Sequence, residues 1–98
     1  MEILQNKNGN TMNVALKGRL DTTTAPQLEE ALKSAISDVT SLIFDFSELD
    51  YISSAGLRVL LASQKQMNTR GEMKVTHVND TIMEIFDVTG FTDILTIE

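Results

Sequence analysis

The segment that most constrains the fold lies near the middle of the chain. Residues 41–46 read SLIFDF, a short and almost continuously apolar run, rich in residues that favour strands. Such a run is typical of a strand that is covered on both faces. Segments with helical apolar spacing precede and follow it, and strands separated by single helices usually pair in parallel. The sequence therefore predicts an α/β fold with residues 41–46 as its central strand.

The N-terminal part of the chain predicts a β-hairpin. Residues 2–5 and 12–17 have extended character, and Asn8-Gly9 between them accepts the positive φ of a tight turn. The second of these strands alternates apolar and polar residues, so one of its faces is expected to be buried.

Three segments have the spacing and end signals of helices. The first begins near Thr24, the second at Ser53 or Ser54, and the third at Asn79 or Asp80. The second is expected to run for roughly four turns before a glycine. The predicted apolar faces comprise Leu28, Ala31, Leu32, Ala35 and Ile36, then Leu57, Leu60, Leu61, Gln64 and Met67, then Ile82, Met83, Ile85, Phe86 and Val88.

Two further strands complete the predicted fold, at residues 73–78 and 94–97, while residues 47–50 are expected to form a polar loop. The predicted order is β-β-α-β-α-β-α-β. It favours a mixed sheet, made of the N-terminal hairpin and parallel strands, with about three helices packed against it. A chain of 98 residues is predicted to form one domain, spanning residues 1–98.

Composition narrows the range of functions. The net charge is −6, so protein partners are favoured, and neither nucleic acid nor an anionic membrane is expected. The chain has no cysteine, hence no disulfide, thiolate nucleophile or cysteine-based metal site. No apolar run approaches the ~20 residues that span a bilayer, and no signal peptide is recognisable at the start. A cytoplasmic location is expected.

Hydroxyls and carboxylates gather where the predicted parallel strands end. Partners and ligands of open α/β sheets bind at that edge. Asp21 follows the second strand, and Ser54 opens the helix after the central strand. The other polar side chains expected at this edge include Thr22, Thr23, Ser47, Asp50, Tyr51 and Ser53.

Ser54 stands out among these residues. A phosphate at a helix N-terminus is accepted by the free N–H groups and by the helix dipole, so phosphorylation is expected to spare the fold. It would add about −1.5 to −2 units of charge near Glu48 and Asp50, and so weaken the docking of a partner. On the local pattern alone, plain helix capping by Ser53 or Ser54 is the more common use of such a pair.

From Asp45 the chain reads DFSELDYISSAGLRVLL, which resembles the motif that joins the central strand to its helix in the STAS family. The family pattern is Asp-x-Ser-x-hydrophobic-x-aromatic-hydrophobic-Asp-Ser-small-Gly-hydrophobic. Gly18-Arg19-Leu20-Asp21 also resembles the family element that ends the second strand. The matching positions of the main motif are Asp45, Ser47, Leu49, Tyr51, Ile52, Ser54, Ala55, Gly56 and Leu57.

Two features depart from that pattern. Ser53 stands where the family usually has aspartate, so Ser53 is a rival of Ser54 as phosphate acceptor. Many relatives also carry a further helix after the last strand, whereas this sequence ends at Glu98.

The resemblance implies an anti-sigma-factor antagonist, a binding protein that is no enzyme and needs no cofactor. Its unphosphorylated form binds an anti-sigma factor that is also a serine kinase, and so frees the sigma factor. Phosphorylation of Ser54 ends the binding, and a metal-dependent serine phosphatase restores it. We expect a monomer whose docking surface comprises Asp21, Thr22, Thr23, Ser47, Asp50, Tyr51, Ser53, Ser54, Ala55, Gly56, Leu57, Arg58 and Leu61.

Within the same fold, the alternative function is a regulatory subunit of a transporter or signalling scaffold. Such a subunit could also bind a nucleotide, as some members of the family are thought to do. The chain has no P-loop motif to hold the phosphates of a nucleotide. A hydrolase would need a base beside Ser54, and the single histidine, His77, is more often a structural residue. A Mg²⁺ site formed by Asp21, Asp45 and Asp50 is also disfavoured, because acidic loop residues are usually solvated.

Overall fold

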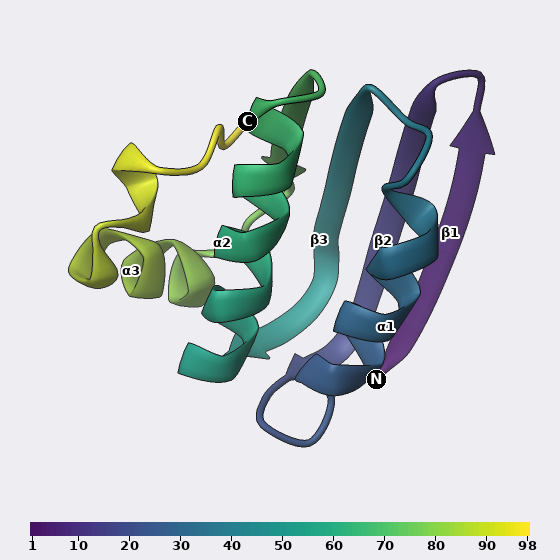
Figure 1. Ribbon diagram of the computed structural model, residues 1–98. Coiled ribbons are helices and arrows are strands. Elements are labelled where there is room, and N and C mark those ends of the chain that lie inside the picture. The colour runs from purple at the N-terminus through teal and green to yellow at the C-terminus, as the bar shows by residue number, and fades with distance from the viewer.

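The computed structural model describes residues 1–98. One four-stranded sheet, in the order β1-β2-β3-β4, is combined with three α-helices and a short 3₁₀ helix, η1 (Figure 1). The predicted mixed sheet, and the order of elements up to the third helix, are confirmed. The elements are β1 Glu2–Asn8, β2 Thr11–Leu20, α1 Ala25–Ala35, β3 Ser41–Ile52, α2 Ser54–Asn68, β4 Glu72–Thr76, α3 Asp80–Thr89 and η1 Phe91–Asp93.

The sheet combines the predicted hairpin with parallel strands. β1 pairs antiparallel with β2, and Gly9 in their turn has a φ of 63°, as expected for its place in a tight turn. β2 and β4 both pair in parallel with β3, through crossovers that contain α1 and α2. β3 is therefore an interior strand, as predicted.

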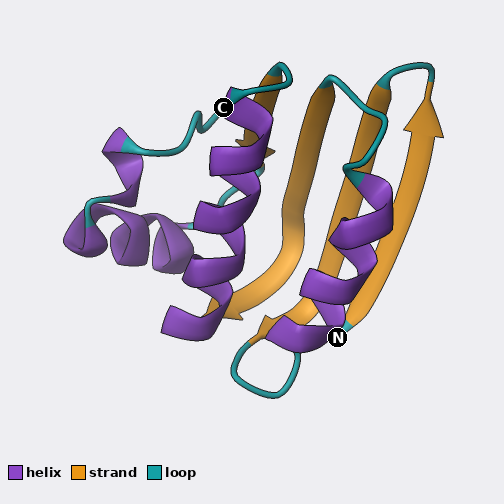
Figure 2. Ribbon diagram, in the orientation of Figure 1, coloured by secondary structure: helices purple, strands orange, loops and turns teal.

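β3 is nevertheless covered on one face only, so the prediction of two covered faces is wrong. Leu42, Phe44 and Phe46 are fully buried, but Ile43 and Asp45, which point to the opposite face, are partly exposed. The reason is topological. Both crossovers step across the sheet in the same direction, from β2 to β3 to β4, and crossovers of one hand then place their helices on the same face (Figure 2).

β3 is also longer than predicted, because residues 47–50 continue the strand instead of forming a loop. Two register shifts against β2 mark β-bulges, one between the partners of Ala15 and Lys17 and one between those of Gly18 and Arg19. Each bulge adds one residue to β3, so the buried positions after Phe46 fall three residues apart. Because this spacing differs from the two-residue alternation of a regular strand, the sequence pattern does not show that these residues belong to β3.

The C-terminal part departs from the prediction in two places. β4 ends at Thr76, two residues before the predicted end, because His77 has a φ of 57° and turns the chain out of the strand. The predicted strand at residues 94–97 is reduced to one parallel bridge between Val75 and Ile97, after η1.

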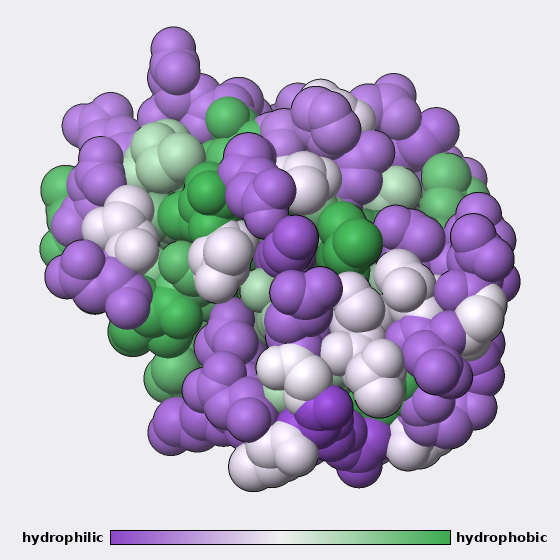
Figure 3. Space-filling model, turned by 90° about the horizontal axis from the view of Figure 1, so that it is seen from above, coloured by the Kyte–Doolittle hydropathy of each residue, from purple (hydrophilic) through white to green (hydrophobic).

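The core is one cluster of 24 buried residues on the helix-covered face. Ala31, Leu61, Met83 and Ile85 are only partly buried and Val88 is 77% exposed, so the predicted apolar faces of α1, α2 and α3 were each too wide. Figure 3 shows the end of the molecule where the parallel strands begin. This end is mainly hydrophilic, and its hydrophobic surface gathers on the side of α3 and η1.

Candidate functional site

The carboxyl ends of β2 and β3 meet beside the start of α2. The backbone N–H of Ser53 donates to the carbonyl oxygen of Leu20 at 2.9 Å, which ties the end of β3 to the end of β2. Asp21 follows Leu20 directly, and Ser54 follows Ser53 as the first residue of α2. The structure therefore brings Asp21 and Ser54 to the same edge, as the sequence predicted.

Gly56 allows α2 to begin this close to the two strands. A Cβ atom at Gly56 would lie 2.6 Å from Cγ of Leu20 and 2.8 Å from Cγ1 of Ile52. Both neighbours are fully buried in the core and have no free space into which to move. The glycine of the motif thus sets the distance between the helix start and the strand ends.

Asp21 organises the turn that leads into α1. Its Oδ1 accepts hydrogen bonds from the Thr23 hydroxyl at 2.7 Å, the Thr23 N–H at 3.0 Å and the Thr24 N–H at 3.2 Å. The hydrogen bond from the Thr23 side chain is the largest cause of a lowered pKa of Asp21, so this carboxyl group stays ionised. The Thr24 hydroxyl donates to the carbonyl oxygen of Arg19 instead of capping α1. Thr22 is left exposed.

The two serines at the start of α2 have different surroundings. Ser54 is exposed at the first position of the helix. Ser53 is the N-cap residue, but its side chain makes no capping hydrogen bond, and its Oγ is buried without a partner. A protein partner can therefore reach the hydroxyl of Ser54 directly, whereas that of Ser53 is covered.

The remaining predicted site residues divide into three groups. Ala55 is partly exposed, Arg58 exposed and Leu61 partly buried, all on α2 beyond Ser54. Gly56 and Leu57 are buried, so they shape this surface from beneath. Ser47, Asp50 and Tyr51 belong to the bulged part of β3. The guanidinium of Arg19 lies over the ring of Tyr51, with its Cζ atom 4.6 Å from the ring centroid.

Asp45, the first residue of the motif, stabilises the first bulge. Its Oδ1 accepts the backbone N–H of Ser47 at 2.9 Å and lies 3.2 Å from Nδ1 of His77. The N–H of Ser47 is the largest cause of a lowered pKa of Asp45, and His77 adds to it. Asp45 is thus engaged with His77 and not with Asp21 or Asp50. No group of three or more carboxylate, histidine or cysteine side chains is placed to hold a metal ion.

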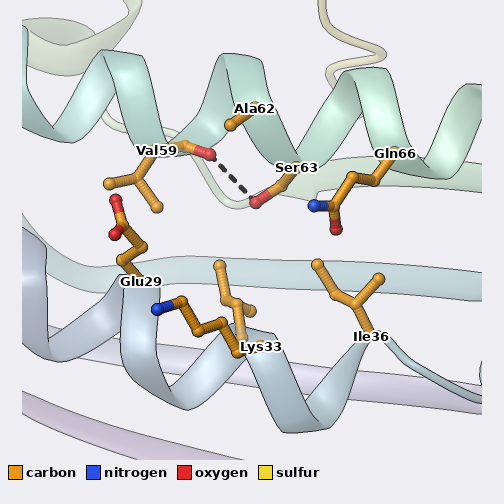
Figure 4. A pocket seen from close by; sticks show the side chains of 8 residues that line it. Glu29, Lys33, Ile36, Val59, Ala62, Ser63 and Gln66 are labelled. Carbon is orange, nitrogen blue, oxygen red and sulfur yellow. Dashed lines mark hydrogen bonds between the residues drawn. The ribbon is translucent and has the colours of Figure 1, made fainter.

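A groove between α1 and α2, which sequence reasoning missed, runs away from this edge. Near the helix starts a cavity of about 360 Å³ is lined by Thr22, Ala25, Pro26, Glu29, Ala55, Arg58 and Val59. Further along, a cavity of about 190 Å³ shares Glu29 and Val59 and adds Leu32, Lys33, Ile36, Ala62, Ser63 and Gln66 (Figure 4). The Ser63 hydroxyl donates to the carbonyl oxygen of Val59 at 2.9 Å.

No helix is both long and apolar enough to span a bilayer.

The fold and this edge together define a class: a one-sided α/β sheet that presents an exposed serine hydroxyl where its interior strand passes into a helix. The family model described as the STAS domain matches residues 2–98, and the chain belongs to this family.

Named relatives and a solved structure agree with this membership. The chain is 29% identical to the anti-sigma-B factor antagonist of Bacillus subtilis (strain 168), over 99% of this chain and 88% of that protein. It is 32% identical to the anti-sigma-B factor antagonist of Staphylococcus aureus (strain NCTC 8325 / PS 47), over 84% and 78%. The crystal structure of an anti-sigma factor antagonist from Mycobacterium paratuberculosis superposes with a TM-score of 0.89 at 23% identity, covering 98% of this chain and 83% of that one.

Proposed function

We propose that this protein is an anti-sigma-factor antagonist in the cytoplasm, controlled by phosphorylation of Ser54. Its unphosphorylated form binds an anti-sigma factor that is also a serine kinase, and this binding releases the sigma factor. The kinase transfers the γ-phosphoryl group of ATP to Oγ of Ser54, the hydroxyl proton is lost and ADP leaves. A metal-dependent serine phosphatase removes the phosphate again. The chain itself supplies a hydroxyl and a docking surface, and no catalytic group.

The observation that carries this proposal is the exposed hydroxyl of Ser54 at the first position of α2. A phosphate here faces the free N–H groups of the first helical turn, so the folded state can accept it. At the same time it adds about −1.5 to −2 units of charge to a surface that already contains Asp21, Glu48 and Asp50. The names of the relatives, which are antagonists of anti-sigma factors, support the choice of partner.

The decisive experiment compares two substitutions at Ser54. Ser54→Ala should bind the kinase persistently in the presence of ATP, because no phosphate can be added. Ser54→Glu places a carboxylate at the docking surface and should bind about tenfold to a hundredfold more weakly, for a cost of up to about 3 kcal/mol. Affinities can be measured by isothermal titration calorimetry with the purified kinase.

Phosphate mapping supplies the control. Incubation of the wild type with kinase and ATP, followed by intact-mass and fragment spectrometry, should place one phosphate on Ser54. Ser53→Ala should still be phosphorylated, since the Ser53 hydroxyl is covered. Equal affinities of Ser54→Ala and Ser54→Glu would refute the switch, and a phosphate on Ser53 would move the site.

A further inference from the structure

Arg58 is a cation without a carboxylate partner in the structure. Of the eight lysines and arginines, Lys7, Lys17, Arg19, Lys33 and Lys74 each lie within 4.0 Å of a carboxylate oxygen. Arg70 donates to the carbonyl oxygen of Ile36. Only Arg58 and Lys65 remain, both exposed on α2. Arg58 follows Ser54 by four residues, whereas Lys65 lies three turns from it.

The helix geometry directs Arg58 toward Ser54. Residues four apart lie above one another on the same face of a helix, and side chains lean toward the helix N-terminus. The guanidinium of Arg58 can therefore reach back over the first turn, where Ser54 is exposed. A negative group that precedes a positive one by four residues is also the favourable orientation of such a pair.

The surroundings leave room for a phosphate at this place. Arg58 lines the cavity of about 360 Å³ together with Thr22 and Ala55, directly beside the start of α2. Glu29 lines the same cavity from α1, but neither Glu29 nor Arg58 takes part in an ion pair. A phosphate on Ser54 would thus meet one free arginine, which can donate two parallel hydrogen bonds to it.

We infer that Arg58 holds the phosphate of phosphorylated Ser54, and that the unphosphorylated protein offers Arg58 to an acidic group of its partner. This inference rests on the proposed function, because it takes Ser54 as the modified residue. Phosphorylation then weakens docking in two ways: it adds negative charge to the surface, and it occupies the one free cation next to the site.

The pairing can be tested without the kinase. Phosphoserine is incorporated at position 54 during translation, and the second pKa of the phosphate is measured by ³¹P NMR. Arg58 stabilises the dianion, so Arg58→Gln should raise this pKa by roughly 0.2–0.4 unit. Arg58→Lys keeps the charge and should raise it less. Lys65→Gln removes the other unpaired cation of α2 and should leave the pKa unchanged.

Binding of the unphosphorylated protein to the kinase tests the second part of the inference, namely that Arg58 contacts an acidic group of the partner. Arg58→Gln should weaken binding to the purified kinase about fivefold or more, with a smaller dependence on salt, whereas Lys65→Gln should not. Equal phosphate pKa values in the wild type and in Arg58→Gln would overturn the pairing. A kinase that leaves Ser54 unmodified would refute the proposed function, but the titration would still decide whether Arg58 holds a phosphate.

Discussion

At the scale of single residues, Gly56 sets how closely α2 approaches the strands. Alanine at this position gains about 1 kcal/mol in helix propensity. Its Cβ would overlap the buried side chains of Leu20 and Ile52, and such overpacking typically costs about 1–3 kcal/mol. Because both neighbours are fully buried, we expect Gly56→Ala to lower the free energy of unfolding, measured by urea titration.

A double-mutant cycle identifies the cause. Leu20→Ala removes the side chain with the closest overlap, so Gly56→Ala should cost less in that background than in the wild type. Additive effects of the two substitutions would show that the contact with Leu20 is not the reason.

The sequence could predict the site at this scale only in part. The motif placed Ser53 and Ser54 at the start of a helix, but both have the same chemistry and both fit the role of a cap. Their difference arises from the tertiary structure, since Ser53 Oγ is covered while one residue further on the side chain faces solvent. Asp21 was predicted at the edge, but its hydrogen bonds to Thr23 and Thr24 required the actual turn.

At the scale of elements, Asn79 joins α3 to the bulged part of β3. Its Oδ1 accepts the N–H of Ile82 at 2.9 Å and so caps the helix, while its Nδ2 donates to the carbonyl oxygen of Leu49 at 2.8 Å. Asn79→Ala removes both hydrogen bonds and should cost about 1–3 kcal/mol of stability, measured by chemical denaturation.

A matched variant separates the two contributions. Asn79→Asp keeps an oxygen for the cap but loses the donor to Leu49, so its stability should lie between those of the wild type and the alanine variant. If Asn79→Asp were as stable as the wild type, the link to β3 would contribute nothing measurable.

The elements show where pattern analysis succeeds and where it fails. The alternation in β2 identified its buried residues correctly, and the helical spacing of α1 did so except at Ala31, which is only partly buried, because one regular period runs through each element. β3 has regular alternation only as far as Phe46, and the bulges then change its period. The last predicted strand has the right composition, but only Ile97 forms a bridge.

At the scale of the whole molecule, the acidic surface predicts how stability depends on pH. Hydrogen bonds from Thr23, Lys7 and the Ser47 N–H are the largest causes that lower the pKa values of Asp21, Asp38 and Asp45, respectively, below the ordinary value of 3.8. A carboxyl group with a lowered folded-state pKa stabilises the protein above its unfolded pKa and loses this contribution as the pH falls through the folded value.

We therefore expect the thermal midpoint to fall as the pH drops from about 5 through 3.8 and below. In Asp21→Asn the midpoint should be lower at neutral pH, and the difference from the wild type should shrink on acidification. Asp93→Asn, which removes an exposed carboxylate without an ion pair, serves as the control. A constant difference between wild type and Asp21→Asn at all pH values would contradict the role of the carboxylate.

The overall architecture was the most predictable level. Single helices between strands fixed the parallel pairing, and the hairpin signal fixed the antiparallel edge. The one-sided placement of the helices was not predicted, because the apolar run at residues 41–46 does not indicate that Ile43 lies on a face that is partly exposed to solvent.

The two bulges of β3 also bear on how the chain can change in length over evolution. Polar surface stretches such as residues 47–50 are usually where insertions and deletions accumulate. Here, loss of one residue would remove a bulge and restore regular alternation with Leu49 and Ile52 still facing the core, but it would reduce the bend that β3 makes before Ser54. Natural variants that lack one residue of this stretch should therefore keep the same side chains in the core, while the start of α2 shifts relative to the end of β2.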